Sequence, residues 1–192
     1  MPTETKDNSG RSWVRRLLIR TPFAHRIDLT GKRIIVTGAS PGSIGYATAR
    51  TLATWGASVV ITARSTPEDS AASLRATLPP ESCGRIVPAR LDLVQADSVA
   101  RFVQWYTDTQ GQQLDVLVNN AGIHLDLLSQ WKSPQLTADG FEMHWRINYL
   151  GSFDLTRRLL PLLLTTGAKS DDARTVNVVS MLHNKGRNVD LF

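Results

Sequence analysis

The sequence contains little cysteine and no long apolar run. Cys83 is the single cysteine in 192 residues, which excludes a disulfide within the chain and is compatible with a reducing compartment. The longest apolar run, 159–164, is interrupted by a proline and is far shorter than the ~18 residues needed to span a bilayer. Arginines interrupt residues 13–20, where the apolar core of a signal peptide would lie. These absences predict a soluble, cytoplasmic protein.

The charged and histidine side chains give no support to nucleic-acid or metal binding. Residues 1–33 hold eight basic and three acidic side chains, an excess of five that equals the net charge of the whole chain. The body of the protein is therefore neutral overall, so nucleic acid is not an expected partner. His124, His144 and His183 lie on different predicted elements without ligand spacing or companion cysteines, so no metal site is predicted.

The N-terminal extension contains one amphipathic stretch, 12–20. Trp13, Val14, Leu17 and Leu18 fall on one face of a helix, and arginines occupy much of the remainder. Three interpretations stay open. The stretch is a short helix that docks on the domain, an interfacial helix that gives peripheral membrane contact with anionic lipid, or a disordered segment.

Beyond the extension, residues 1–30, short apolar runs alternate with helical patterns. Strands are predicted at 33–37, 58–63, 86–91, 114–118 and 174–179, and helices near 43–55, 67–78, 96–109 and 137–166. Nearly uninterrupted apolar strands indicate burial on both faces, as in a parallel sheet. The alternation implies right-handed βαβ connections. Residues 31–192 are therefore predicted to form one α/β domain, a Rossmann-like doubly wound parallel sheet in three α/β/α layers.

A glycine-rich turn follows the first predicted strand. Residues 37–45 read Thr-Gly-Ala-Ser-Pro-Gly-Ser-Ile-Gly and lead directly into a helical pattern. Glycines let a backbone turn tightly and approach a diphosphate, and the N-terminus of the following helix attracts the anion. The candidate dinucleotide-binding residues in this turn are Gly38, Ser40, Gly42, Ser43, Ile44 and Gly45.

A second motif, Asn-Asn-Ala-Gly at residues 119–122, follows the apolar strand 114–118. With both motifs in this order, the chain resembles the short-chain dehydrogenase/reductase family, whose members are nicotinamide-dependent oxidoreductases. The resemblance implies that Asn119, Ala121 and Gly122 lie beside the ribose and nicotinamide of the cofactor.

Two further strand ends are predicted to contact the cofactor. At the end of the second strand, where an NAD-specific site would carry Asp or Glu, the chain has Ala63 followed by Arg64. A guanidinium can bind a 2′-phosphate with paired hydrogen bonds, so NADP(H) is predicted in preference to NAD(H). The resemblance implies that Asp92 and Leu93, after the third strand, meet the adenine. A turn or helix cap is the alternative role for Asp92.

The second half of the domain resembles the retinol-dehydrogenase-like branch of the family. Residues 139–153 contain an Asp-Gly-Phe-Glu run followed by Asn148 at the spacing of that branch. The resemblance implies that the main-chain carbonyl of Asn148 holds a water for a proton relay. In the segment 174–183, Ser180 takes the place of the catalytic serine, whose hydroxyl bonds the substrate oxygen. The implied substrate is a small apolar alcohol or carbonyl compound.

The chain departs from the family pattern in two places. Its glycine turn is one residue longer, with Ser43 and Ile44 between the last two glycines. It also lacks the Tyr-x-x-x-Lys pair, in which the lysine lowers the pKa of the tyrosine that transfers the proton. Tyr46, Tyr106 and Tyr149 are followed four residues later by Arg50, Gln110 and Phe153. In the family the pair comes after the serine, so it would fall beyond Phe192.

We therefore expect this chain to be the N-terminal portion of such an enzyme, with a cofactor site and half of a catalytic site. The alternatives are a catalytically inactive, truncated NADP-binding module, and a scaffold that associates through its N-terminal helix. Without the strands that follow in the family, residues 175–179 would form an exposed apolar edge. Poor stability is expected for the isolated chain, and homo-oligomerisation for a complete enzyme.

Overall fold

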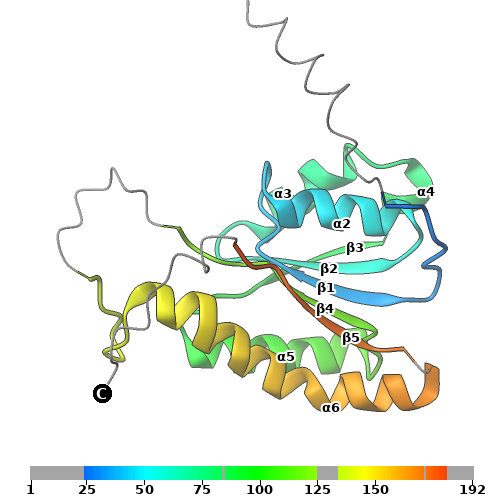
Figure 1. The fold of residues 1–192 in the computed structure, drawn as a ribbon. Helices are drawn as coiled ribbons and strands as arrows, with labels where there is room; N and C mark the ends of the chain where they lie inside the picture. Colours follow the sequence, from blue (N-terminus) through cyan, green and yellow to red (C-terminus); the bar gives the residue numbers. More distant parts are fainter. Residues whose placement is uncertain (1–23, 84, 125–133, 171, 181–192) are drawn as a thin grey trace, which may run out of the picture.

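The centre of the molecule is a five-stranded parallel sheet (Figure 1), seen in a computed structural model that describes residues 24–83, 85–124, 134–170 and 172–180. The strands are β1 (Arg33–Thr37), β2 (Ser58–Ala63), β3 (Ile86–Arg90), β4 (Val116–Asn119) and β5 (Arg174–Asn177). Their order is β3-β2-β1-β4-β5, and every neighbouring pair is parallel. The strand order changes direction at β1, so the sheet is doubly wound. The predicted Rossmann-like α/β fold is confirmed.

Helices cover both faces of the sheet (Figure 1). One face carries α2 (Ile44–Thr54), α3 (Pro67–Arg75) and the short α4 (Pro80–Cys83), and the other carries α5 (Ala96–Gln110), η1 (Trp145–Gly151) and α6 (Ser152–Ser170). η1 is a π-helix that continues directly into α6. Within the described part of the chain, no helix has the length and apolarity needed to cross a membrane. The amphipathic stretch 12–20 lies outside the described residues.

Alternate residues of the central strand enter two separate cores. On β1, Ile35 shares a core with side chains of α5 and α6, whereas Ile34 and Val36 share one with side chains of α2 and α3. All three are at most 2% exposed, as burial on both faces of a parallel sheet requires. Burying each such side chain contributes about 1.5–3 kcal/mol, which explains why the strands are nearly uninterrupted apolar runs.

β5 is the exposed edge of the described sheet. All its residues are exposed, and Val176, Val178 and Val179 are 44%, 42% and 76% exposed. Strand edges of this kind pair readily with other chains. The strand is shorter than the predicted 174–179, but the expected apolar edge is present.

The predicted helix 137–166 starts too early. A turn closed by a bridge between Leu136 and Glu142 comes first. Its Gly140 adopts φ +82°, a conformation that glycine tolerates and a right-handed helix does not contain. The helical residues therefore begin after this turn, and α6 runs on to Ser170.

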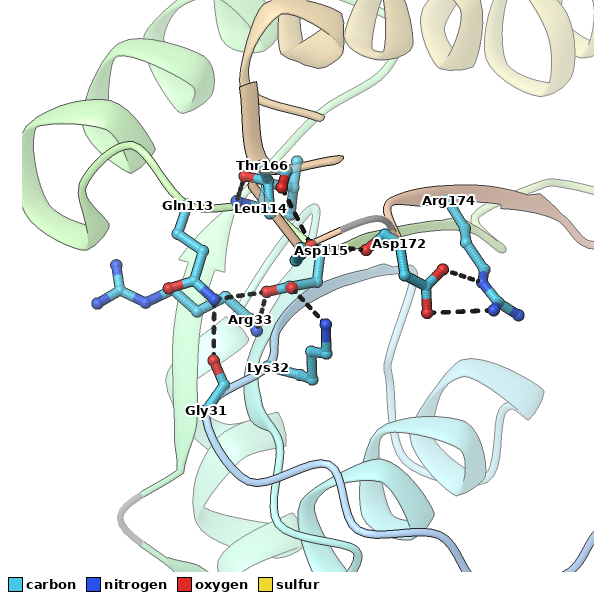
Figure 2. A network of polar contacts seen from close by, with 10 residues as sticks. Gly31, Lys32, Arg33, Gln113, Leu114, Asp115, Thr166, Asp172 and Arg174 are labelled. Carbon is cyan, nitrogen blue, oxygen red and sulfur yellow. Dashed lines mark hydrogen bonds and ion pairs between the residues drawn. The ribbon is translucent and has the colours of Figure 1, made fainter. Parts of the chain in front are cut away.

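A buried carboxylate connects the amino ends of three strands (Figure 2). Asp115 is 1% exposed, and its Oδ1 accepts a hydrogen bond from Lys32 Nζ at 3.0 Å. Its Oδ2 accepts from Arg33 N at 2.9 Å and from Gln113 Nε2 at 2.8 Å. The Asp115 main-chain carbonyl accepts from Arg174 N. One residue therefore links β1, β4 and β5 at the edge opposite their carboxyl ends.

Candidate functional site

A cavity of about 490 Å³ opens at the carboxyl ends of β1, β2 and β4. Ligands of doubly wound sheets bind at this edge, where the strand order changes direction. Most of the predicted cofactor residues line its wall: Gly38, Ser40, Ser43, Ile44, Arg64, Asp92, Leu93, Ala121 and Gly122. The wall also contains residues that were not predicted: Thr62, Ala63, Leu91, Asn120, Ile123 and Ile147. Gly42, Gly45 and Asn119 are not on the wall.

The glycine turn and the segment after β4 approach so closely that no side chain fits between them. Gly38 adopts φ +68°, and a Cβ on it would lie 2.7 Å from Ala121 Cα. A Cβ on Gly45 would lie 2.7 Å from the Gly38 carbonyl oxygen. Both distances are far inside van der Waals contact, so both positions require glycine. The turn has the open backbone that the approach of a diphosphate needs, and the residues present fit a dinucleotide.

Ser43, one of the two residues between the last two glycines of the turn, is the N-cap of α2. Ser43 Oγ accepts a hydrogen bond from Tyr46 N and donates one to the Gly38 carbonyl, both at 3.1 Å. Gly42, just before it, adopts φ +81°. Serine is a preferred N-cap residue because its hydroxyl satisfies an unpaired helix N–H. The longer turn therefore still leads into a helix N-terminus, with its partial positive charge, at the cavity wall.

Asn120, and not Asn119, joins the two cofactor motifs. Asn120 Nδ2 donates to the carbonyls of Thr37 at 2.8 Å and Gly38 at 3.2 Å. Thr37 Oγ1 accepts from the N–H groups of Asn120 at 3.0 Å and Ala121 at 2.9 Å. Asn120 was not predicted as a site residue. The alternation of side chains along an extended strand, which sends neighbours to opposite faces, was the signal that could have found it.

Asn119 points away from the cavity into the sheet. Its Nδ2 donates to Thr156 Oγ1 of α6 and to Asn177 Oδ1 of β5, each at 2.9 Å. The residue is 8% exposed, and its buried Oδ1 has no hydrogen-bond partner among the described residues. We expected Asn119 beside the cofactor ribose and nicotinamide. In the structure it connects β4 to α6 and β5, because its side chain leaves the strand on the face opposite to Asn120.

The ends of β2 and β3 bring one cation and one carboxylate to the wall. Arg64 follows β2, is exposed, and is the basic side chain of the wall. The Asp92 carboxylate is engaged locally, since its Oδ1 accepts from Val94 N at 3.0 Å and its Oδ2 from Gln95 Nε2 at 3.2 Å. Asp92 therefore closes the turn that leads into α5, which is the alternative role considered for it, while it also borders the cavity.

The two predicted catalytic residues lie off the cavity wall. Asn148 belongs to η1, and its Oδ1 accepts from Ile123 N at 2.8 Å while its Nδ2 donates to Ile123 O at 2.9 Å. π-helical turns are frequent at functional sites, and this one contributes Ile147 to the wall. Ser180 lies three residues beyond the end of β5 and is exposed. Asn148 therefore lies behind the wall, hydrogen-bonded to the wall residue Ile123, whereas Ser180 does not lie on the wall.

None of the three tyrosines of the chain lines this cavity. The Tyr46 hydroxyl is hydrogen-bonded to a serine of α3. The Tyr106 hydroxyl donates to the Gln113 carbonyl at 2.7 Å, and burial raises the pKa of Tyr106. Tyr149 lies on the surface between two aromatic side chains of η1 and α6. No tyrosine of this chain is placed to exchange a proton with a group bound in the cavity.

Acidic groups before η1 form ion pairs. Glu142 accepts from His144 Nδ1 at 2.7 Å and from Trp145 N at 2.9 Å, and Arg146 Nε donates to Asp139 Oδ2 at 2.8 Å. Burial opposes ionisation of Glu142, but the hydrogen bonds from His144 and Trp145 together outweigh it and hold the pKa of Glu142 below its usual range. Within the residue ranges that the structure covers, no three metal-ligating side chains gather, and His183 lies outside those ranges.

The sequence matches proteins of one family along most of its length. Residues 32–190 match the family described as short chain dehydrogenase. The chain is 36% identical to retinol dehydrogenase 12 of Homo sapiens over 161 residues, which cover 84% of this chain and 47% of that protein. It is 38% identical to the polyprenol dehydrogenase of Danio rerio over 160 residues, 83% of this chain and 47% of that protein. The chain thus spans about half the length of the curated relatives it matches.

Solved structures show the same similarity. The RhlG/NADP active-site complex of Pseudomonas aeruginosa superposes with a TM-score of 0.66 at 31% identity, covering 82% of this chain and 58% of that chain. A short chain dehydrogenase of Shigella flexneri 2a complexed with NADP superposes with a TM-score of 0.64 at 28% identity, covering 85% of this chain and 64% of that chain. With the glycine turn and the Asn-Asn-Ala-Gly segment closing one cavity, this chain belongs to the short-chain dehydrogenase/reductase family and to its retinol-dehydrogenase-like branch.

Proposed function

We propose that this chain binds NADP(H) and forms the cofactor-binding part of an oxidoreductase. The observation that carries the proposal is the cavity in which the glycine turn, the start of α2 and Arg64 share one wall. Backbone N–H groups at the start of α2 would hold the diphosphate, and Ala121 and Gly122 leave space at the opposite end of the wall. When bound, the nicotinamide supplies the capacity for hydride transfer, and the residues of this chain hold and orient it.

Arg64 is the reason for proposing NADP(H) in preference to NAD(H). It follows Ala63, the last residue of β2, so no carboxylate stands there to bond the ribose hydroxyls. A guanidinium matches the geometry of a phosphate and would bind a 2′-phosphate with two charge-assisted hydrogen bonds. Two of the similar solved structures contain NADP, which supports the preference.

For the whole protein, we propose a reaction with the alcohol or carbonyl carbon of a small apolar substrate. The relatives named retinol dehydrogenase and polyprenol dehydrogenase support an apolar alcohol as the substrate class. The residues proposed to serve the reaction are Asn148 and Ser180, with Ser180 Oγ bonding the substrate oxygen. The chain contains no Tyr-x-x-x-Lys pair to complete them.

A module that binds NADP(H) without turnover is the second candidate function. Two observations favour it: Ser180 lies off the cavity wall, and no tyrosine of the chain lies on it. Both candidate functions use the same cofactor site, so they differ only in whether bound cofactor reacts.

We also propose that the whole protein is a cytoplasmic homo-oligomer and that it contacts a membrane peripherally. The oligomer is supported by an exposed apolar stripe along η1 and α6, formed by Trp145, Tyr149, Phe153, Leu160 and Leu164. These residues recur at helical spacing on one side, and the Tyr149 ring contacts the Trp145 ring in a tilted arrangement and stacks on the Phe153 ring. Contiguous apolar surface of this kind marks an interaction site. The basic N-terminal stretch supports the membrane contact.

Calorimetric titration of the folded chain with NADPH and with NADH tests the proposed cofactor site. We expect heat of association with both nucleotides and tighter binding of NADPH. Turnover of a panel of ketones and aldehydes, lost in Ser180→Ala, would favour the enzyme, and binding without turnover would favour the module. A folded sample that binds neither nucleotide would overturn both.

A further inference from the structure

Gly151, the last residue of η1, packs directly against the main chain of the turn between β3 and α5. A Cβ on Gly151 would clash with the Leu93 carbonyl oxygen and would lie 2.7 Å from Leu93 Cβ and 3.1 Å from the Leu93 carbonyl carbon. Non-bonded carbon atoms pack at about 3.5–4.0 Å, so no side chain fits between the two residues. Gly151 does not have a positive φ. The contact with Leu93, and not the backbone conformation, therefore requires glycine at this position.

Leu93 separates Gly151 from the cofactor cavity. Leu93 lies on the cavity wall and is only 5% exposed, and its side chain belongs to the core that the sheet shares with α5 and α6. Gly151 is buried and does not lie on the wall. A group added at Gly151 can therefore change the cavity only by displacing Leu93 or η1.

The part of the wall at Leu93 is suited to the adenine base of a dinucleotide. In doubly wound sheets the end of β2 meets the adenosine ribose. β3 follows β2 at the edge of the sheet, so the turn after β3 lies beyond the ribose, on the side away from the glycine turn. Leu91 and Leu93 give this turn an apolar surface on the wall, which matches the face of a base. Leu91 N donates to the Ala63 carbonyl at 3.1 Å, which fixes the turn to the end of β2.

We propose that Gly151 is a positioning residue for the cofactor: it lets η1 contact the Leu93 main chain and thereby sets the width of the pocket for the adenine base. This role rests on the proposed binding of NADP(H). η1 also contributes Ile147 to the wall and carries Asn148. One helical segment would therefore support both the base pocket and a residue proposed to serve the reaction.

The turn, and not the helix, should yield to a side chain at position 151. η1 and α6 form one continuous helical segment that is anchored by buried side chains: Ile147, Leu155, Leu159, Leu162 and Leu163. Displacing the segment would disturb all of these contacts, whereas displacing the turn strains only a few local hydrogen bonds, such as that from Asp92 N to Ser98 Oγ at 3.0 Å. A methyl group on Gly151 should therefore push Leu93 into the cavity and narrow the base pocket.

Calorimetric titration of Gly151→Ala with NADP and with its ethenoadenine analogue, which has a larger base, tests the proposal. Relative to the unsubstituted chain, we expect the affinity for NADP to fall at least about tenfold and that for the analogue at least about thirtyfold, because a narrowed pocket excludes the larger base more strongly. The matched control is Gly167→Ala on α6, where an added Cβ would lie 3.3 Å from Ala173 Cβ, away from the cavity wall. It should change both affinities less than about twofold. A variant that is only less stable would lose affinity for both nucleotides equally, so equal losses, or no loss, would overturn the proposal.

A second measurement needs no substitution and covers the case in which Gly151→Ala does not fold. In the unsubstituted chain saturated with NADPH, nuclear Overhauser effects should connect the adenine protons to the Leu93 methyl groups. Bound NADPH without these contacts would overturn the positioning role and leave the proposed cofactor site standing. A folded chain that binds no NADPH would overturn both. The two proposals therefore fail in distinguishable ways.

Discussion

Gly38 and Ala121 approach so closely that a Cβ added to Gly38 would lie 2.7 Å from Ala121 Cα. Gly38→Ala should therefore displace the glycine turn from the segment after β4. The left-handed backbone adds a cost of about 1–2 kcal/mol. We expect NADPH affinity to fall at least about tenfold, or 1.4 kcal/mol, in calorimetric titration. Gly31→Ala is the matched control, since Gly31 has φ +82° but nothing within 4 Å of its Cβ position. It should lose stability and keep its affinity for NADPH, and equal affinity losses in the two variants would contradict the steric explanation.

Removing the guanidinium of Arg64 should lower the affinity for NADPH much more than the affinity for NADH. Hydrogen bonds to charged groups contribute about 1.5–3 kcal/mol, so Arg64→Ala should weaken NADPH binding by about 10- to 100-fold. NADH affinity should change less than about twofold, because NADH lacks the 2′-phosphate. Arg101→Ala, on the exposed surface of α5, should leave both affinities unchanged. An equal loss for NADPH and NADH would show that Arg64 does not read the 2′-phosphate.

The buried Asp115 carboxylate should be important for stability and irrelevant to cofactor affinity. Asp115→Ala leaves the Lys32 ammonium and the Arg33 N–H without their acceptor, and we expect it to lower the free energy of unfolding by about 3 kcal/mol in urea titration. Asp108→Ala, which removes an exposed carboxylate that accepts from Gln104 Nε2, should change it by less than about 0.5 kcal/mol. NADPH affinity of the folded Asp115 variant should be retained, because the cavity lies at the opposite edge of the sheet.

Acid should destabilise the turn before η1. The hydrogen bond from Thr137, with Arg146 nearby, holds the pKa of Asp139 below its usual range in the folded protein. In the unfolded chain Asp139 has the ordinary Asp pKa of about 3.9. Between the folded pKa and this value, the unfolded chain therefore binds more protons than the folded protein. The stabilisation is complete above that value and is lost as pH falls through the folded pKa. Thermal unfolding followed from about pH 6 to pH 3 should show a shallower decline for Asp139→Asn than for the unsubstituted chain. Identical slopes would mean that Asp139 has no part in the acid sensitivity.

The exposed edge at β5 should promote self-association of the 192-residue chain. We expect the 192-residue product to self-associate and to unfold without a sharp transition, because Val176 of β5 and the two valines just after the strand are exposed. Val179→Lys, at a position 76% exposed, should reduce self-association without altering any buried contact. Light scattering and calorimetry provide the measurement. A monomeric, cooperatively unfolding parent chain would refute the expectation.

The position of the glycine turn between a strand and a helix could be predicted because its determinants are local. Gly38 and Gly45 stand at fixed distances from the end of a strand and the start of a helix, and Arg64 directly follows the next strand. The early start predicted for the helix 137–166 has the opposite cause. Apolar spacing alone could not reveal that Gly140 takes φ +82° and closes a turn before the helix.

By itself the sequence determined the fold class and the family, because strand burial, helix periodicity and the glycine turn are properties of short segments. Only the tertiary structure decided which of two adjacent asparagines contacts the glycine turn. Asn120 bonds the Thr37 carbonyl across 83 positions of the chain, whereas Asn119 bonds Asn177 across 58. The partners of the two asparagines depend on the register between distant strands, and that register cannot be read from a local pattern of residues.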